Sequence, residues 1–182
     1  MKAVTPIKAL PKEPFEIARD AANAWRGRCL DLFTRCEAAV TETLLVLAAN
    51  CTGPGSVKRP HLLGQRYDAL ADAIGSGGPF QSSAGSAAGS LDQLKQLDSL
   101  RTHLAHGVFT VTLDHTGTWH LISTVLSLRA SKESRDTYVV DQEGAAAALA
   151  RLERIASRLR SDLGQVRERC RDGSAVGAAQ GK

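Results

Sequence analysis

Apolar residues recur every three or four positions along four stretches of the chain, a spacing that predicts amphipathic helices. The stretches cover about 15–50, 59–74, 91–107 and 141–171. The first has the longest unbroken stripe, formed by Ala18, Ala22, Trp25, Cys29, Leu32, Cys36, Val40, Leu44 and Leu47. Pro14 suits the first turn of the first helix, and Asp141 can cap the last one. Helices with continuous apolar stripes favour a helical bundle.

Between the third and fourth helical stretches the spacing changes to strict alternation. Apolar residues at 109–113 are separated by threonines, as expected for a half-exposed strand. The turn-forming sequence Asp-His-Thr-Gly-Thr follows at 114–118, and the apolar pattern returns over 119–128. The expected fold is therefore mainly α: about four helices, with a small β-hairpin at 108–128 inserted before the last helix. Residues 138–140 fit a short third strand.

Several segments of the chain lack a periodic apolar pattern, and those at the two ends bound the expected domain. Residues 1–13 carry lysines and prolines and are predicted to be a flexible N-terminal arm. The tract 75–90 consists mostly of Gly, Ser and Ala and is predicted to be a flexible loop within the domain. The segment 172–182 is predicted to be a disordered tail, and 52–55 a turn. A single helical domain over 14–171 remains.

The composition agrees with one helical core and leaves the partner open. Hydrophobic residues make up 43% of the chain but aromatic residues only 4%, so the core must consist mainly of Leu, Ala and Val. The net charge of +4 permits an anionic partner without requiring one. The sequence shows neither the apolar core of a signal peptide nor an apolar run near the ~20 residues of a membrane span, so we expect a cytoplasmic protein without a membrane partner.

The four cysteines, Cys29, Cys36, Cys51 and Cys170, form no Cys-x-x-Cys motif. Cys29 and Cys36 are seven residues apart on the apolar stripe of the first helix. Buried thiols of this kind behave as small apolar side chains. We expect reduced, buried cysteines rather than disulfides or metal ligands.

The helix expected at 91–107 carries the clearest functional signal. Ser90 and Gln93 are spaced as a capping box at its start, and Gly107 suits a left-handed cap at its end. Its apolar stripe consists of Leu94, Leu97, Leu100 and Leu104. At about 100° per residue, Arg101 falls inside that stripe, where a guanidinium needs a carboxylate or carbonyl partner.

Glu37 lies at the edge of the apolar stripe of the first helix and is the candidate partner of Arg101. It can either face inward and orient Arg101 or stay at the solvent boundary, and the sequence does not decide between the two. His106 lies about 140° around the helix from Arg101, so the two side chains are not stacked neighbours. They can converge on one anion at the helix end, or a second copy of the helix can complete the pair.

The sequence RTHLAH at 101–106, followed by a glycine and the expected hairpin, resembles the HEPN superfamily of small helical domains. HEPN domains occur in RNases of toxin–antitoxin, antiviral and CRISPR-associated systems. The Arg and His of the family's motif match Arg101 and His106. The residue after the motif's arginine is usually Asn, Asp or His in that family, and Thr102 departs from this pattern. The similarity in layout covers most of residues 15–171.

The resemblance implies a metal-independent endoribonuclease that needs no cofactor, with a composite active site formed by the motifs of two protomers. It assigns phosphate stabilisation to Arg101 and acid or base chemistry to His106. Thr102 and His103 would make secondary contacts, with Glu37 in support. The implied partners are RNA, a second copy of the chain and a cognate antitoxin or other partner protein. Because many domains of the superfamily are non-catalytic, the alternative is an RNA- or nucleotide-binding or protein-interaction regulatory module.

Arginines are concentrated in the last helix. Seven arginines lie between Arg151 and Arg171, against three acidic residues. Arg151, Arg154 and Arg158 share one helical face, where they either steer phosphates or form an ordinary solvated, salt-bridged surface.

Two interpretations compete with the ribonuclease site. In the first, Arg101 only pairs with Glu37, and His106 caps the helix end near its partial negative charge. In the second, His103 and His106 share a metal ion with a histidine of the hairpin. No acidic or thiol ligand completes such a set, so we expect no metal site.

Overall fold

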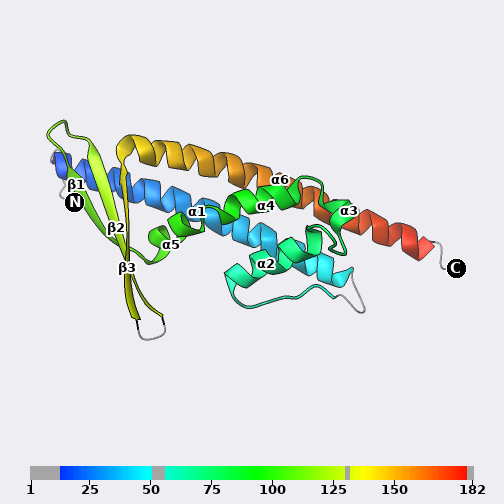
Figure 1. Cartoon of the computed structure of the whole chain (residues 1–182). Coiled ribbons are helices and arrows are strands. Elements are labelled where there is room, and N and C mark those ends of the chain that lie inside the picture. Colours follow the sequence, from blue (N-terminus) through cyan, green and yellow to red (C-terminus); the bar gives the residue numbers. More distant parts are fainter. Residues whose placement is uncertain (1–12, 51–55, 130–131, 180–182) are drawn as a thin grey trace, which may run out of the picture.

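The computed structural model of the protein describes residues 13–50, 56–129 and 132–179. Two long helices, α1 (Pro14–Ala49) and α6 (Gln142–Ala179), run side by side and form the body of the molecule (Figure 1). α1 has its proline in the first turn, as expected, and continues unbroken through Gly27. The Asp141 carboxylate accepts a hydrogen bond from the Gly144 amide at 2.7 Å, which confirms Asp141 as the N-cap of α6.

The core lies where α1 and α6 face each other, and α2 (Leu63–Ile74) packs against α1. Its largest fully buried side chains include Phe33, Val40, Leu47, Leu152, Leu159 and Leu163. The Trp25 indole donates a hydrogen bond to the Ala145 carbonyl at 2.7 Å and so ties α1 to the first turn of α6. The core is therefore mainly aliphatic, as the composition predicts.

The described cysteines are free and buried, as expected: Cys29, Cys36 and Cys170. Burial raises the pKa of Cys29 to about 12 and that of Cys36 to about 11. The two thiols of α1 therefore serve as small apolar core side chains. Cys51, the turn expected at 52–55 and residues 1–12 of the expected arm lie outside the described residues.

The tract 75–90, expected to be a flexible loop, contains α3 (Gln81–Ala84) and the first turn of α4 (Ala87–Lys95). Alanines of both helices are buried, and both helices pack against α6. Ser90 lies inside α4 instead of capping a helix, and its hydroxyl donates a 2.5 Å hydrogen bond to the buried Asp162 of α6. Small side chains allow this close packing. They leave no periodic pattern of large apolar residues in the sequence, so the two helices could not be predicted from it.

The single helix expected over 91–107 is broken. Gln96 and Leu97 form a turn after α4, and α5 (Asp98–His106) follows. α4 packs against α2 and α6, whereas α5 packs against α1 and the strand β2 (Trp119–Arg129). The two helices on either side of the turn therefore have different packing partners.

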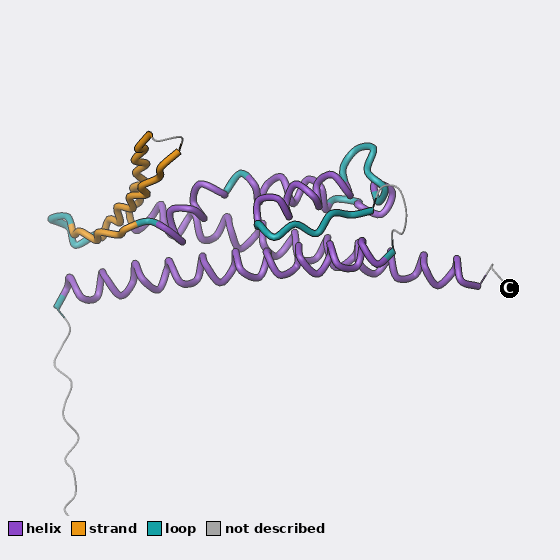
Figure 2. The backbone as a smooth tube through the Cα atoms, turned by 90° about the horizontal axis from the view of Figure 1, so that it is seen from below, coloured by secondary structure: helices purple, strands orange, loops and turns teal. Residues whose placement is uncertain are grey.

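The β structure is a three-stranded antiparallel sheet, in which the third strand is longer than the three residues, 138–140, that the sequence predicts. β1 (Val108–Leu113) pairs with β2 as expected, and β3 (Lys132–Asp141) adds a full third strand along β2. The pairing of β1 ends where Val108 lies opposite Thr124, so β2 and β3 continue beyond it as a two-stranded ribbon. This ribbon projects away from α1 and α6 (Figures 1 and 2).

Gly107 joins α5 to β1 with extended backbone, not with the left-handed conformation that the sequence analysis predicts. A Cβ at this position would collide with the Ser123 hydroxyl and the His103 carbonyl. Glycine is therefore required here because the backbone approaches β2 closely, and not because of its φ angle.

α6 is longer than expected. Its backbone is helical to Ala179, whereas the sequence pattern ends the helix near Arg171 and predicts a disordered tail over 172–182. Cys170 is the last residue of α6 that is described as buried. The apolar stripe therefore does not predict that the helix continues beyond Arg171. In the part of the chain that the structure describes, no helix has the length and apolar character needed to cross a membrane.

Candidate functional site

Arg101 and Glu37 form an ion pair between α5 and α1. The Arg101 Nε donates to Glu37 Oε1 at 2.6 Å, and the side chains keep 23% and 25% of their surface exposed. Of the two positions open to Glu37, the structure therefore shows the inward one. Among the described residues, neither terminal nitrogen of the Arg101 guanidinium donates to a protein acceptor. The pair thus holds the arginine at Nε and leaves Nη1 and Nη2 available.

Tyr67 of α2 is close enough to this pair for the charges of Glu37 and Arg101 to act on its hydroxyl. The side chain is 4% exposed, and its hydroxyl has no hydrogen-bond partner among the described residues. Burial, followed by the Glu37 carboxylate, raises the pKa of Tyr67. The phenol therefore stays neutral beside the ion pair.

His106 is exposed at the C-terminal end of α5, and Thr102 is half-buried next to Arg101. Among the described residues, His106 makes no hydrogen bond or ion pair, so it does not contact Arg101 directly. Five positions separate the two residues, which corresponds to about 7.5 Å along the helix axis. α5 therefore presents an anchored cation and an unengaged imidazole on one short helix.

Arg26 of α1, which the sequence pattern does not single out, holds the end of α5. Its Nε donates to the Leu104 carbonyl at 2.8 Å, and its guanidinium carbon lies 4.2 Å from the centre of the Phe109 ring. A positive charge at the carbonyl end of a helix is stabilising. The sequence feature that could have indicated this role is the position of Arg26 next to the buried Trp25, at the edge of the apolar stripe of α1.

His103 points into the protein, where it links α5 to the sheet. It is 2% exposed, with Nδ1 3.2 Å from Ser123 Oγ and Nε2 3.2 Å from Asp136 Oδ2. These three side chains have the order of a Ser-His-Asp triad, but Ser123 is fully buried and no substrate can reach its hydroxyl. The structure therefore places His103 in the interior, bonded to β2 and β3, rather than on an exposed face of α5.

The arginine face expected on α6 borders a groove of about 460 Å³ between α6 and α4. The groove is lined by Gln93, Gln96, Arg151, Arg154, Ile155 and Arg158. Arg151 and Arg154 form no ion pair with any described residue, and Arg158 lies 3.9 Å from Asp162. Gln96 belongs to the turn that leads into α5, so one end of this polar, cationic groove lies beside the helix of Arg101.

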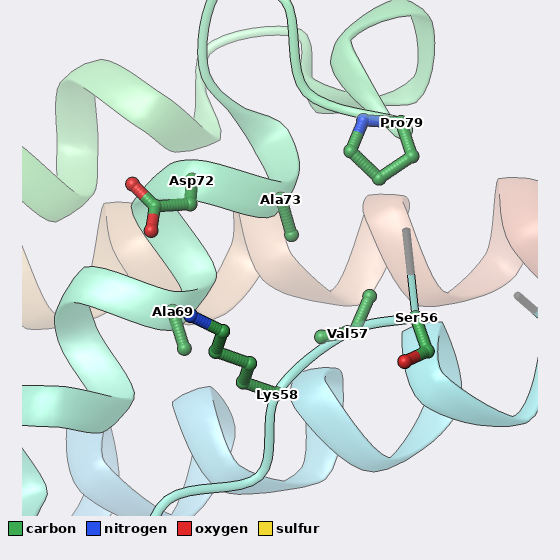
Figure 3. A pocket seen from close by; sticks show the side chains of 7 residues that line it. All are labelled: Ser56, Val57, Lys58, Ala69, Asp72, Ala73 and Pro79. Atoms are coloured by element: carbon green, nitrogen blue, oxygen red, sulfur yellow. The ribbon is translucent and has the colours of Figure 1, made fainter. Parts of the chain in front are cut away.

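A smaller hollow of about 120 Å³ lies between α2 and the segment that precedes it (Figure 3). It is lined by Ser56, Val57, Lys58, Ala69, Asp72, Ala73 and Pro79. None of the candidate residues selected from the sequence belongs to this lining. The hollow is therefore separate from the candidate site on α5.

The hairpin histidine His120 pairs with Asp114, its Nε2 lying 3.3 Å from Asp114 Oδ2. It therefore stabilises the turn between β1 and β2. No three His, Cys, Asp or Glu side chains in residues 13–50, 56–129 and 132–179 are grouped as a metal site requires. His103 is buried and His106 is exposed at the end of α5.

Comparisons with known proteins give no relative. No protein-family model matches the chain, and no curated protein and no solved structure matches it.

Proposed function

We propose that the protein is a metal-independent RNA endonuclease of HEPN type, with Arg101 and His106 as its catalytic residues. The observation that carries the proposal is the state of Arg101: Glu37 holds its Nε at 2.6 Å, while both terminal nitrogens lack protein acceptors in the described residues. A guanidinium anchored in this way is prepared for bidentate contact with a phosphate. His106, exposed on the same helix, is a histidine, the side chain that most often serves as a general acid or base.

In the proposed reaction the RNA supplies its own nucleophile. The 2′-oxygen attacks the adjacent phosphorus, and the bond between phosphorus and the 5′-oxygen breaks. The products are a 2′,3′-cyclic phosphate and a 5′-hydroxyl. His106 accepts the proton of the 2′-hydroxyl or donates one to the leaving 5′-oxygen. Arg101 stabilises the negative charge that collects on the phosphoryl oxygens.

A composite site made by two copies of the chain supports both proton transfers. Each α5 offers one exposed imidazole, His106, because His103 is buried against Ser123 and Asp136. One copy of His106 then serves as base and the other as acid. A cytoplasmic role in toxin–antitoxin or antiviral defence, with an antitoxin as a further partner, belongs to this proposal because it fits an RNase of this kind.

The second candidate function is an RNA- or nucleotide-binding regulatory module without catalysis. The groove between α4 and α6 favours it, because Arg151 and Arg154 carry positive charge that no described acidic residue compensates. Arg101 and His106 do not line this groove. Binding of phosphates there does not require a reaction at α5.

The deciding experiment is cleavage of labelled RNA in excess EDTA by the wild type, Arg101→Ala and His106→Ala. His115→Ala is the matched control, since His115 is an exposed histidine in the turn after β1. We expect both site variants to lose about a hundredfold or more of the cleavage rate, and the control to lose none. Circular dichroism establishes equal folding. RNA binding without cleavage by any of the four proteins would favour the regulatory module.

A further inference from the structure

β3 has an unpaired edge. The strand order β1-β2-β3 puts β2 on one side of β3 and leaves the other side open. Residues 133–137 are all exposed, and among the described residues their backbone groups bond only to β2. An open edge of this kind can accept another strand. Figure 2 shows that the ribbon carrying this edge stands clear of the helices.

The charges along this edge have a self-complementary order. Residues 132–136 read Lys-Glu-Ser-Arg-Asp, which is positive, negative, neutral, positive, negative. When two such strands lie antiparallel with Ser134 opposite Ser134, Glu133 of each copy faces Arg135 of the other. The outer positions, 132 and 136, are again oppositely charged. Paired positions differ by an even number, so each pair lies on one face of the sheet.

The neighbouring registers bring like charges together. A shift of two residues in one direction places Arg135 opposite Arg135, and a shift in the other direction places Glu133 opposite Glu133. A shift of one residue moves side chains to opposite faces of the joined sheet. Charges on an edge strand usually prevent pairing. In this order they disfavour the wrong registers and favour the one centred on Ser134.

We propose that β3 is a self-association surface, and that a second copy of the chain pairs with it antiparallel about Ser134. The two three-stranded sheets then form one continuous sheet. Backbone groups of residues 132–136 that face solvent in one copy gain partners in the other. Opposite-charge pairs across the joint stabilise the pairing and set its register.

This pairing brings the two α5 helices toward one axis. Asp136 is two residues from Ser134, hence about 7 Å from the axis along the strand, and it contacts His103 of α5 at 3.2 Å. Both α5 helices therefore lie on the same face of the joined sheet, one on each side of the axis. The association thus brings the two α5 helices, which carry the motifs, to the same side of one interface. This consequence rests on the proposed ribonuclease function, whereas the pairing itself does not.

Charge reversal tests the pairing by sedimentation at micromolar concentrations. We expect the wild type to self-associate, and Glu133→Arg and Arg135→Glu each to weaken self-association by about tenfold or more, because both central pairs become like-charged. A mixture of the two variants should associate, since each copy then meets opposite charges. The double variant Glu133→Arg/Arg135→Glu should associate like the wild type. Thr110→Arg, on the outer strand β1, is the control and should have no effect.

A cysteine at the axis gives a second measurement. In a Cys51→Ser background, Ser134→Cys places two thiols directly opposite each other, at a Cα separation that a disulfide spans. Oxidation should link the two copies covalently. Ser127→Cys, on β2 opposite Ser134 within the ribbon, should remain unlinked. A monomeric wild type, or charge variants that associate equally well alone and mixed, would overturn the proposal.

Cleavage of RNA by the same variants separates the two proposals. If no protein cleaves RNA but the charge variants associate only when mixed, the interface stands and the ribonuclease proposal fails. If the wild type cleaves RNA and remains monomeric, the interface proposal fails and the catalytic one survives in a single-copy form.

Discussion

The Arg101 Nε donates a 2.6 Å hydrogen bond to Glu37 Oε1 although 64 residues separate the two in sequence. The pair joins α5 to the second half of α1, so the position of the arginine depends on how these two helices pack together. Both side chains remain about a quarter exposed, which places the pair at the boundary of the core. An arginine held in this way is stabilised without being withdrawn from solvent.

Removal of the Glu37 carboxylate should therefore destabilise the protein. We expect Glu37→Ala to lower the free energy of unfolding by about 2 kcal/mol, because it leaves a half-buried guanidinium without its acceptor. Glu37→Gln keeps an acceptor oxygen and should cost about 1 kcal/mol. Urea unfolding measures both values. Glu42→Ala is the control: Glu42 is exposed and lies 3.8 Å from Arg167, so its loss should cost less than about 0.5 kcal/mol. Equal losses at Glu37 and Glu42 would contradict the special role of the pair.

The features that could be predicted from the sequence are those with a long, regular signal. The apolar stripe of α1 consists of nine residues between Ala18 and Leu47, and Glu37 lies at its edge. From that position the pair with Arg101 is one of two possibilities. The alternation of β1 and the turn chemistry of Asp114 likewise need only neighbouring residues. Such local patterns determine elements without knowledge of their packing partners.

The features that could not be predicted depend on contacts between distant segments. The turn at Gln96 exists because α4 and α5 have different neighbours, which no local spacing records. The inward position of His103 requires Ser123 and Asp136, and Asp136 lies on a strand whose polar sequence lacks alternation. In a ribbon with both faces in solvent, neither face needs apolar residues, so the usual strand pattern is missing.

Asp114 should make the stability of the β1–β2 turn depend on pH. Hydrogen bonds from Thr116, with further donors at Thr118 and His120, lower the pKa of Asp114 from its ordinary value of 3.8 to about 2. A carboxyl group with a lowered pKa contributes stability above its unfolded pKa, and this contribution is lost as the pH falls through the folded pKa. The difference in unfolding free energy between the wild type and Asp114→Asn should thus shrink as the pH falls from about 5 toward 2. Urea titrations across this range measure it.

The same dependence on pH, between about pH 5 and pH 2, should appear when the main hydrogen-bond donor to Asp114, the Thr116 hydroxyl, is removed. Thr116→Ala deletes the side-chain hydrogen bond that contributes most to the shift, so its difference from the wild type should also shrink toward low pH. A difference that does not change between pH 5 and pH 2 for either variant would show that these hydrogen bonds do not favour the ionised carboxylate.

The core thiols should resist alkylation. Burial raises the pKa of Cys29 to about 12 and that of Cys36 to about 11, so at pH 8 only roughly one thiol in a thousand, or fewer, is a reactive thiolate. We expect iodoacetamide to modify both cysteines at least about a hundredfold more slowly in the native protein than in denaturing urea. Mass spectrometry of peptides reads each site separately. Rapid native labelling of either cysteine would mean that the contact between α1 and α6 opens readily.

The groove between α4 and α6 should contribute to RNA affinity through charge alone. Arg151 and Arg154 line it and pair with no described acidic residue, so phosphates are their available partners. Replacing both with alanine should weaken RNA binding about tenfold and reduce the slope of log affinity against log salt by about 1.4, since each phosphate contact on a single strand contributes about 0.7. Fluorescence anisotropy at a series of salt concentrations measures both quantities.

The matched control for the groove removes the same charge elsewhere. Arg19→Ala/Arg171→Ala replaces two exposed arginines that lie outside the groove, and the salt slope should stay close to that of the wild type. Because Arg101 and His106 are intact in both double variants, the cleavage rate at saturating RNA should be unchanged in each. If the two double variants lower the slope equally, the arginines act only through net charge and the groove is not a binding site. If the groove variant alone lowers the slope, the RNA backbone follows α6 toward the turn that leads into α5.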